Sequence, residues 1–549
     1  MRIRHLRARG IARILARGAD VVAAVAGAAA ATSRESHRVG RFYITTAIDY
    51  ANGDPHLGHA FEKIGADVIA RYRRMSGDDV HFLLGMDEHG QKVASEAADR
   101  GVQPQALVDD VAERFQAMWK RLSISNDQFI RTTEASHRAG VTALIEAIFR
   151  HSPDDFFEKE YEGWYCVGCE SFKQDNEIIQ GKCILHPTRT LQWVAERNWF
   201  FRLSAYTDRL RSLISGTNFL GPKSRKNEML ALLDQGLEDI SASRSRFSWG
   251  VPFPRPSSNG ETQTTYVWFD ALPNYLTATG YPATGYDNRW PADLHVIGKD
   301  ITRFHSIIWP AMLMAAGLEV PRHVWAHGFV LLAGDRFSKS AGVRLDLDET
   351  IDRFGPDAFR YFLLREVPFD ADGNFSWERF EERYNAELAN AFGNLASRTI
   401  SMIDRYRGGV VPAGSDDAID AADDEDLAAY RGHMNGESGY LLHEALKSVW
   451  RTVARANEFV DRQAPWKLAA DPAMAGELDR TLGSLARQLV RQTAYIAPFM
   501  PDKAQALWER LGAPGQVSGH TFEQVHSLDS AGWQVTKGDP LFPKEPKQA

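Results

Sequence analysis

Residues 41–85 constrain the fold of this chain more than any other segment. Residues 41–48 are rich in β-branched and aromatic side chains, as a buried strand requires. Apolar residues then recur at helical spacing over 57–74, and Gly77 follows them as a helix stop. Residues 80–85 are a second apolar strand. Strand, helix and strand in this order make one βαβ unit of a parallel sheet, so an α/β fold is predicted.

The turn before the predicted helix has a recognisable start signal. Residues 52–54 read Asn-Gly-Asp and are followed by Pro55. Aspartate is favoured as the N-cap of a helix, and proline is favoured at the first helical position. We therefore expect Asp54 to cap this helix.

The remaining strand signals are widely separated along the chain. Apolar strands recur only near 294–297 and 324–332, so the segment between about 130 and 262 is predicted to be an insertion in the sheet domain. After about residue 385 the sequence is helix-like with few strand signals. A C-terminal helical domain is therefore expected.

Residues 1–40 differ in composition from the rest. They hold eight arginines and two acidic residues, a net charge of +6, while the whole chain carries −8, which leaves −14 for the remainder. An organellar transit peptide, a secretory signal or an upstream start codon would each explain this Arg- and Ala-rich extension. The apolar run 21–31 is shorter than the roughly 20 residues that span a bilayer, so no membrane association is expected. Because the remainder is acidic, nucleic acid would have to bind through local basic patches.

All three cysteines of the chain lie in one short segment with a histidine. The spacing is Cys166-x2-Cys169-x13-Cys183-x2-His186. Two short-spaced ligand pairs separated by a loop are typical of a closed Cys3His zinc site, and four protein ligands leave no position for catalysis. One structural Zn²⁺ is therefore predicted. The lack of further cysteines excludes a disulfide framework and favours a reducing compartment, so a cytoplasmic location is expected.

Two further motifs suit the binding of a polyphosphate. His56 and His59 lie at a predicted helix start, where imidazole N–H groups add to the helix dipole, and Gly58 between them lets a planar base approach the backbone. Lys339 lies in a Ser-Lys-Ser loop that could bring an ammonium group onto a polyphosphate as charge develops there. Taken alone, the first motif could be a surface histidine pair and the second a solvated turn.

Together these motifs resemble the two signatures of class I aminoacyl-tRNA synthetases, and within that class the methionyl-tRNA synthetases. Further blocks in the same order are similar to that family, at residues 45–59, 86–90, 161–170, 266–271, 297–305 and 464–466. The resemblance extends from about residue 41 to the end of the sequence. The single zinc knuckle with a histidine as fourth ligand is similar to one bacterial subtype.

The resemblance implies a Rossmann-type parallel sheet split by a zinc-knuckle insertion and followed by an α-helical bundle that binds the anticodon. The implied parts are 1–40 (extension), 41–130 and 263–335 (the two halves of the catalytic domain), 131–262 (insertion), 336–385 (Ser-Lys-Ser loop and stem-contact region) and 386–549 (anticodon-binding domain). It also implies the activity: ATP–Mg²⁺ activates L-methionine to methionyl-adenylate, which is transferred to initiator and elongator methionine tRNA. We expect a monomer.

The same resemblance implies roles for individual residues. His56, His59 and Lys339 would be catalytic, and they would bind ATP together with Gly58, Lys299 and Asp300. Asp87 would hold the ammonium group of methionine. The pocket around the amino acid would comprise Ala47, Ile48, Tyr50, Asp87, Trp268, Ala271, Tyr275, Ile301 and His305. Asn394, Arg398 and Trp466 would read the anticodon; the competing interpretation makes Trp466 a core aromatic residue.

The chain departs from the family pattern at two places. The Lys-Met-Ser-Lys-Ser loop is Arg-Phe-Ser-Lys-Ser here, with Arg336 and Phe337, and Asp49 stands where proline or tyrosine is usual, next to the pocket wall. Two alternatives to a methionine enzyme remain. One is a class I synthetase for cysteine or a branched-chain amino acid, against which the small insertion and the position of the metal ligands argue. The other is a non-catalytic RNA-binding paralogue, against which the intact catalytic motifs argue.

Overall fold

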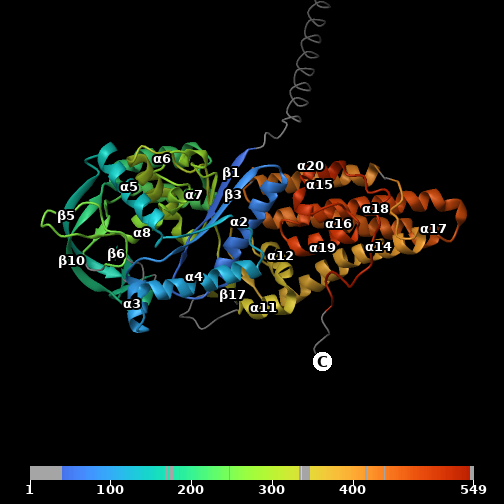
Figure 1. Ribbon diagram of the computed structural model, residues 1–549, viewed down its shortest axis with the longest axis horizontal. Helices are drawn as coiled ribbons and strands as arrows, with labels where there is room; N and C mark the ends of the chain where they lie inside the picture. The colour runs from blue at the N-terminus through green and yellow to red at the C-terminus, as the bar shows by residue number, and fades with distance from the viewer. Residues whose placement is uncertain are drawn as a thin grey trace, which may run out of the picture.

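The computed structural model describes residues 40–544 except 167–170, 174–176, 185, 246–247, 333–334, 337–345, 415–416 and 438. A seven-stranded sheet lies at its centre, and every strand pair in it is parallel. Its strands are β1 (Arg41–Thr46), β2 (Asp49–Tyr50), β3 (Asp79–Asp87), β4 (Gln128–Arg131), β11 (Leu220–Gly221), β15 (Leu294–Gly298) and β16 (Val324–His327). Their order is β11-β16-β15-β1-β3-β2, with β4 paired to β3. Figure 1 shows this sheet between an insertion at one end of an elongated molecule and a group of helices at the other.

The predicted βαβ unit is confirmed. Helix α2 (Leu57–Met75) connects β1 to its parallel neighbour β3, with Ile44 opposite Phe82. Successive β1 residues face opposite sides of the sheet: Phe42 and Ile44 belong to the core that contains α2, and Tyr43 belongs to the core on the other face. Both faces of the sheet are therefore buried, as a parallel sheet requires.

The expected start of α2 is wrong. The helix begins at Leu57, and its N-cap is His56 instead of Asp54. The His56 ring accepts hydrogen bonds from two backbone N–H groups of the first turn. Side-chain capping by histidine thus replaces the capping by aspartate that the sequence pattern predicted.

The predicted strand 324–332 divides into two. It forms β16 in the central sheet and β17 (Val330–Leu332) in a separate small sheet with β18 (Asp335–Arg336) and β19 (Gly373–Phe375). Gly328 lies at the break, where a Cβ atom would come within 2.1 Å of the Ala371 backbone. The close approach of a neighbouring segment therefore turns the chain out of the central sheet.

The insertion is built on a long antiparallel ribbon. Strands β5 (Phe156–Cys166) and β10 (Gln192–Phe201) pair over their full length, flanked by β6 (Ser171–Lys173) and β12 (Ile240–Ser241). A small sheet of β7 (Ile178–Ile179), β8 (Lys182–Cys183) and β9 (His186–Thr190) carries the cysteine-rich segment. Residues 220–221, within the predicted insertion, return as β11 to the central sheet.

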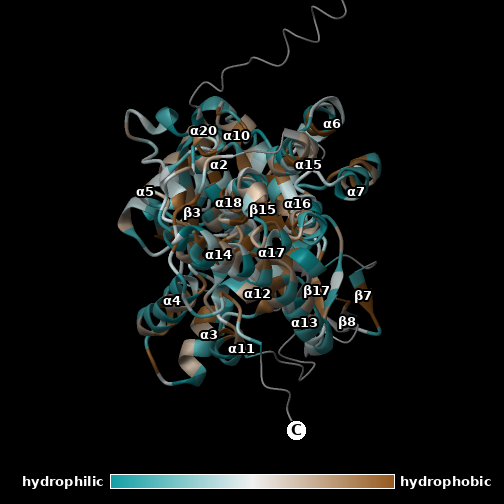
Figure 2. Ribbon diagram, turned by 90° about the vertical axis from the view of Figure 1, so that its right-hand side faces the viewer, coloured by the Kyte–Doolittle hydropathy of each residue, from teal (hydrophilic) through white to brown (hydrophobic). Residues whose placement is uncertain are grey.

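After about residue 385 the described part of the chain is helical, as predicted. Helix α12 (Pro356–Glu366) precedes this region, whose main helices are α14 (Asn394–Arg407), α15 (Asp417–Asn435), α16 (Leu442–Gln463), α17 (Pro465–Leu468), α18 (Ala475–Ile496) and α19 (Pro501–Arg510). Seen from this end, hydrophobic residues gather toward the middle and hydrophilic ones toward the periphery (Figure 2). Among the described helices, none is both long and apolar enough to cross a bilayer.

One buried arginine joins the helices to the sheet domain. Arg360 of α12 is fully buried and donates to Asp67 of α2 at 2.7 Å. It also donates to the backbone carbonyl oxygens of Leu122, Pro498 and Phe499 at 2.9–3.0 Å. Its guanidinium therefore connects three separate segments, and we call this set of contacts the Arg360 junction.

Candidate active site

The two histidines of α2 form one rigid unit. The Nδ1 atom of His56 accepts from the N–H groups of Gly58 (3.1 Å) and His59 (3.4 Å), and Nδ1 of His59 accepts from the N–H group of His56 (3.3 Å). The two rings stack with their centroids 3.6 Å apart and a 14° angle between the planes. Because both Nδ1 atoms are acceptors, the hydrogen of each neutral ring lies on Nε2. The pair therefore presents Nε2–H groups beside a helix N-terminus, an arrangement that suits an anion.

Gly58 has a local role in this arrangement. A Cβ atom at this position would lie 3.1 Å from Cε1 and 3.3 Å from Nδ1 of His56. The missing side chain therefore leaves room for the His56 ring to fold over the helix end. The sequence predicts room for a planar base at this point; the described atoms nearest to it are those of the His56 ring.

The nine residues expected to surround an amino acid meet in one small cavity at the carboxyl end of the central strands. Its described lining comprises Ala47, Ile48, Tyr50, Asp87, Trp268, Ala271, Leu272, Asn274, Tyr275, Ile301 and His305. Ligands of open parallel sheets bind at this edge. The structure therefore brings together residues that are more than 200 positions apart in the sequence.

One part of the cavity lining is aromatic and uncharged. The Tyr275 hydroxyl donates to Nε2 of His305 at 2.7 Å, and Nδ1 of His305 donates to the Ile301 carbonyl oxygen at 3.1 Å. Burial lowers the pKa of His305 to about 4, so the ring is neutral at physiological pH. Trp268 stacks on Phe304 at 3.7 Å. A wall of this kind suits an apolar side chain that contains sulfur.

Asp87 supplies a carboxylate to the same cavity. It is the last residue of β3 and is 5% exposed, and its backbone carbonyl oxygen accepts from the N–H group of Ala51 at 2.9 Å. Backbone pairing thus fixes the residue at the sheet edge while its side chain reaches the cavity. A buried carboxylate in this position suits a cationic group of the ligand.

A buried ion-pair network supports the helix that carries Trp268. The Asp270 carboxylate lies on α8 (Val267–Ala271) and bonds His89 Nδ1 at 2.7 Å and His137 Nε2 at 3.1 Å. Burial alone would raise the pKa of Asp270. His89 and His137 lower this pKa by more than burial raises it, so it lies below its usual value. The carboxylate therefore stays ionised and holds α8 in place.

Sequence reasoning missed three residues of the site. Leu272 and Asn274 line the cavity, and Phe304 supports Trp268 from behind. The Asn274 amide donates to the Ala271 carbonyl oxygen at 2.8 Å, which orients it within the same turn as Tyr275. Their closeness to predicted pocket residues was the only signal in the sequence that could have identified them.

The predicted nucleotide residues follow β15 directly. Lys299 donates to Asp372 at 2.7 Å and lies 4.5 Å from the Phe329 ring centroid. Asp300 occupies the single turn Lys299–Ile301 after Gly298. Lys339, with Phe337 and the rest of 337–345, lies outside the described residues, and Arg336 is described only as part of β18.

Three of the four predicted metal ligands converge. The ligand atoms of Cys166, Cys183 and His186 lie within 4.8 Å of one another, and Cys166 Sγ is 3.9 Å from His186 Nδ1. Both cysteines are buried and pack with Leu191 in a small core of their own. Cys169 lies outside the described residues. The donor set and its burial fit a structural zinc ion.

The predicted anticodon residues gather on one face of the helical domain. The Arg398 guanidinium carbon lies 5.9 Å from the Trp466 ring centroid, and Arg398 also bonds Asp461 at 3.1 Å. Asn394 is exposed one helical turn before Arg398 on α14. Trp466 is 44% exposed, so the alternative that it is a core residue is wrong. An exposed indole beside a guanidinium suits the stacking of an unpaired base.

The chain is similar to known tRNA synthetases over most of its length. A family model described as tRNA synthetases class I (M) matches residues 42–189 and 178–400. The methionine–tRNA ligase of Caldanaerobacter subterraneus subsp. tengcongensis is 42% identical over an alignment of 516 residues that covers 92% of this chain and 78% of that protein. That of Streptomyces coelicolor is 38% identical over 94% of this chain and 98% of its own length. Mycobacterium tuberculosis methionyl-tRNA synthetase in complex with methionyl-adenylate superposes with a TM-score of 0.86 at 39% identity, over 92% of this chain and 100% of that one.

Proposed function

From the premise that this chain belongs to the methionyl-tRNA synthetase family, a branch of the class I tRNA synthetases, we infer the roles of its individual side chains. Members of this family activate methionine with ATP and transfer it to methionine tRNA, and so does this chain. The observation that carries the assignment of residues is the single cavity lined by all nine predicted methionine contacts.

We propose that Asp87 binds the ammonium group of methionine and that the thioether lies against the uncharged wall of Trp268, Tyr275 and His305. The arrangement supports this because the carboxylate and the aromatic wall belong to the same cavity. A neutral His305 avoids a buried positive charge next to sulfur. Binding in this orientation leaves the methionine carboxylate at the sheet edge, near the α2 N-terminus.

The chemical step is an attack of the methionine carboxylate on the α-phosphate of ATP, which releases pyrophosphate and forms methionyl-adenylate. This reaction requires positioning and charge stabilisation more than covalent catalysis. We propose that the Nε2–H groups of His56 and His59 donate to phosphate oxygens. Lys339 would bring its ammonium group onto the departing pyrophosphate. Lys299 and Asp300 are proposed to contact the nucleotide, and Mg²⁺ enters with ATP.

The assignment of the substrate can be tested directly. Pyrophosphate exchange into ATP should depend on methionine, while cysteine, valine, isoleucine and leucine should support little exchange. A strong exchange with cysteine would indicate the alternative class I enzyme. No exchange with any amino acid, from protein that melts cooperatively, would indicate a non-catalytic paralogue.

We also propose that the enzyme acts as a monomer in the cytoplasm. The three cysteines of the sequence have the spacing of a metal site, which requires reduced thiols and so supports a reducing compartment. For a monomer, light scattering during size-exclusion chromatography should give a mass near 61.5 kDa.

We propose that Cys166, Cys169, Cys183 and His186 hold one structural zinc ion. Cys183→Ser should lose the metal and loosen the β7–β9 sheet, because a closed site contributes its binding free energy to local folding. Metal analysis should give one zinc per chain in the wild type and close to none in the variant. Lys182→Ser, at the exposed neighbouring position, is the control and should keep its zinc. Wild-type protein without zinc would contradict the assignment.

We propose that Trp466 stacks on a base of the anticodon. Stacking of a base on an aromatic side chain contributes roughly 1–3 kcal/mol. Trp466→Ala should therefore lower kcat/KM for tRNA by about 5- to 150-fold. Pyrophosphate exchange without tRNA should stay close to wild type, because the exchange site lies in the sheet domain.

Met474→Ala is a matched control for Trp466→Ala. Met474 is another exposed apolar side chain of the helical domain, 39% exposed. It should leave both assays unchanged. Parallel losses of exchange and of melting temperature in Trp466→Ala would withdraw Trp466 from the binding residues.

A further inference from the structure

A buried lysine lies one turn below the histidine pair on α2. Lys63 is 1% exposed, and its Nζ donates to the Ala47 carbonyl oxygen (2.9 Å), Asp49 Oδ1 (2.6 Å) and Glu62 Oε1 (2.8 Å). Three acceptors use all three ammonium hydrogens. Burial alone would lower the pKa of Lys63. Asp49 and Glu62 raise this pKa by more than burial lowers it, so it lies above its usual value. The ammonium group therefore stays charged inside the protein.

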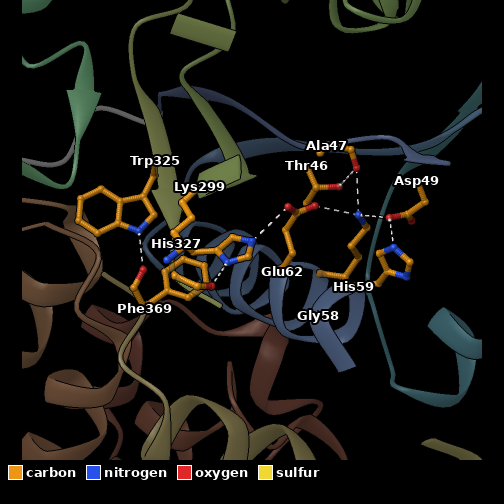
Figure 3. Close-up of polar contacts among 12 residues, drawn as sticks. Thr46, Ala47, Asp49, Gly58, His59, Glu62, Lys299, Trp325, His327 and Phe369 are labelled. Atoms are coloured by element: carbon orange, nitrogen blue, oxygen red, sulfur yellow. Dashed lines mark hydrogen bonds and ion pairs between the residues drawn. The ribbon is translucent and has the colours of Figure 1, made fainter. Parts of the chain in front are cut away.

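Asp49 joins this lysine to the catalytic histidines. It lies between the pocket residues Ile48 and Tyr50 and is 4% exposed. Its Oδ1 atom is 4.0 Å from Nε2 of His59. Since Nδ1 of His59 accepts from the backbone, Nε2 of the neutral ring carries the hydrogen, and this side of the ring faces the carboxylate. Figure 3 shows Asp49 and His59 at one end of the row of contacts and His327 at the other, with Glu62 between.

On the basis of the proposed function, we propose that Asp49 is a positioning residue for His59 in adenylate formation, with Lys63 holding its carboxylate in place. The carboxylate orients the imidazole and polarises its Nε2–H group beside the proposed phosphate site. A distance of 4.0 Å is longer than a hydrogen bond, so the effect is electrostatic; it acts between a buried carboxylate, 3% exposed, and a ring that is 25% exposed. Asp49 is a departure of this chain from its family pattern, and the contact with Lys63 explains how a buried carboxylate is accommodated there.

If Asp49 positions His59, kcat should depend on the ionisation of the Asp49 carboxyl group and therefore on pH. Asp49 faces three titratable residues of α2: Lys63, Glu62 and His59. From β3, Met86 pairs with the Asp49 backbone, and the carboxylate residue Asp87 pairs with Tyr50. Burial raises the pKa of Asp49 to about 7; Lys63 opposes this rise and Glu62 adds to it. The carboxylate is therefore ionised above about pH 7 and becomes neutral below it. Its contribution to kcat should be present above that pH and should be lost as the pH falls.

The test compares Asp49→Asn with wild type in methionine-dependent pyrophosphate exchange between pH 5.5 and 9. We expect kcat at pH 8 to fall by about 10- to 100-fold, as when a partner that orients an imidazole is removed, with KM for methionine nearly unchanged. The decrease of kcat below about pH 7 should shrink in the variant. Lys63→Met should instead shift that decrease to higher pH, because the group that lowers the pKa of Asp49 is gone.

Glu62→Gln is the matched control. Glu62 is a neighbouring buried carboxylate on the same lysine, but its second partner is His327, at 3.1 Å, and not His59. This variant should keep kcat at pH 8 close to the wild type even where its melting temperature falls. Because Glu62 raises the pKa of Asp49, the decrease of kcat should move to lower pH, opposite to the shift in Lys63→Met. Equal losses of kcat in Asp49→Asn and Glu62→Gln, with unaltered pH profiles, would overturn the inference and indicate a structural role.

The inference and the proposed function fail in different ways. If wild-type protein shows no methionine-dependent exchange, the proposed function is wrong. If the wild type is active and Asp49→Asn matches it at every pH, only the role of Asp49 is wrong. If Asp49→Asn does not fold, Lys63→Met is the test. The pH at which kcat decreases should then rise in Lys63→Met; a fall of this pH, or no change, contradicts the role of Asp49.

Discussion

Replacing Asp87 by asparagine is expected to raise KM for methionine by about 30- to 3,000-fold, the largest binding effect of any single change in the cavity. Truncating one partner of a buried, hydrogen-bonded charge pair costs about 2–5 kcal/mol, and each 1.4 kcal/mol corresponds to a factor of ten. Asparagine preserves the shape of the side chain, so the loss reports the charge. The measurement is the methionine dependence of pyrophosphate exchange at saturating ATP.

Asp293→Asn provides the control for that experiment. Asp293 is also a largely buried aspartate of the central sheet; it precedes β15 and accepts from the N–H group of Tyr43 at 2.8 Å. It therefore lies at the amino end of the strands, opposite to the end that carries Asp87. Its replacement should affect stability and leave KM for methionine unchanged. An unchanged KM in Asp87→Asn as well would remove Asp87 from the binding site.

Lys339→Ala should lower kcat of adenylate formation by about 10²- to 10³-fold with little change in KM for methionine. This split is expected of a charge that engages mainly in the transition state, as pyrophosphate departs. The assay is pyrophosphate exchange at saturating substrates, supported by single-turnover formation of methionyl-adenylate.

Arg336→Lys tests, in the same assay, whether the other cationic residue of the loop contributes to kcat as Lys339 does. It restores the residue usual in the family and keeps the charge, so kcat should change by no more than a few-fold. If Lys339→Ala raised KM and left kcat intact, the loop would be a ground-state binding element and the catalytic assignment would be wrong.

The parts of the fold that depend on local patterns could be predicted from the sequence. The β1–α2–β3 unit follows from the residue types of two strands and from a helical repeat, and the convergence of Cys166, Cys183 and His186 follows from their spacing. The capping of α2 could not be predicted, because it depends on how the His56 ring lies over the first turn. β11 has only two residues and joins the sheet through a partner more than 100 positions later, so no local pattern identifies it.

In the candidate site, too, some features follow from local sequence patterns and others depend on contacts between distant segments. The nine cavity residues were identified from their positions in family-like blocks, and their periodicity would not have distinguished Trp268 or Tyr275 from ordinary core aromatics. In the sequence, Lys63 is one of several charged residues of α2, and nothing in the pattern shows that it is buried. Its meaning depends on Asp49, which is 14 positions earlier, and on the Ala47 carbonyl oxygen. Pairings across elements of this kind become visible only when the structure brings the elements together.

The Arg360 junction has a consequence for how the enzyme selects its tRNA. Rotation of the helical domain against α2 would break several hydrogen bonds of a fully buried guanidinium at once, and each unsatisfied buried group costs about 1–3 kcal/mol, more when it is charged. The junction therefore restrains the span between Trp466 and the histidine pair. If Trp466 binds an anticodon base as proposed, a tRNA would have to match this span with its own curvature, and the enzyme would test the shape of the whole tRNA as well as its anticodon.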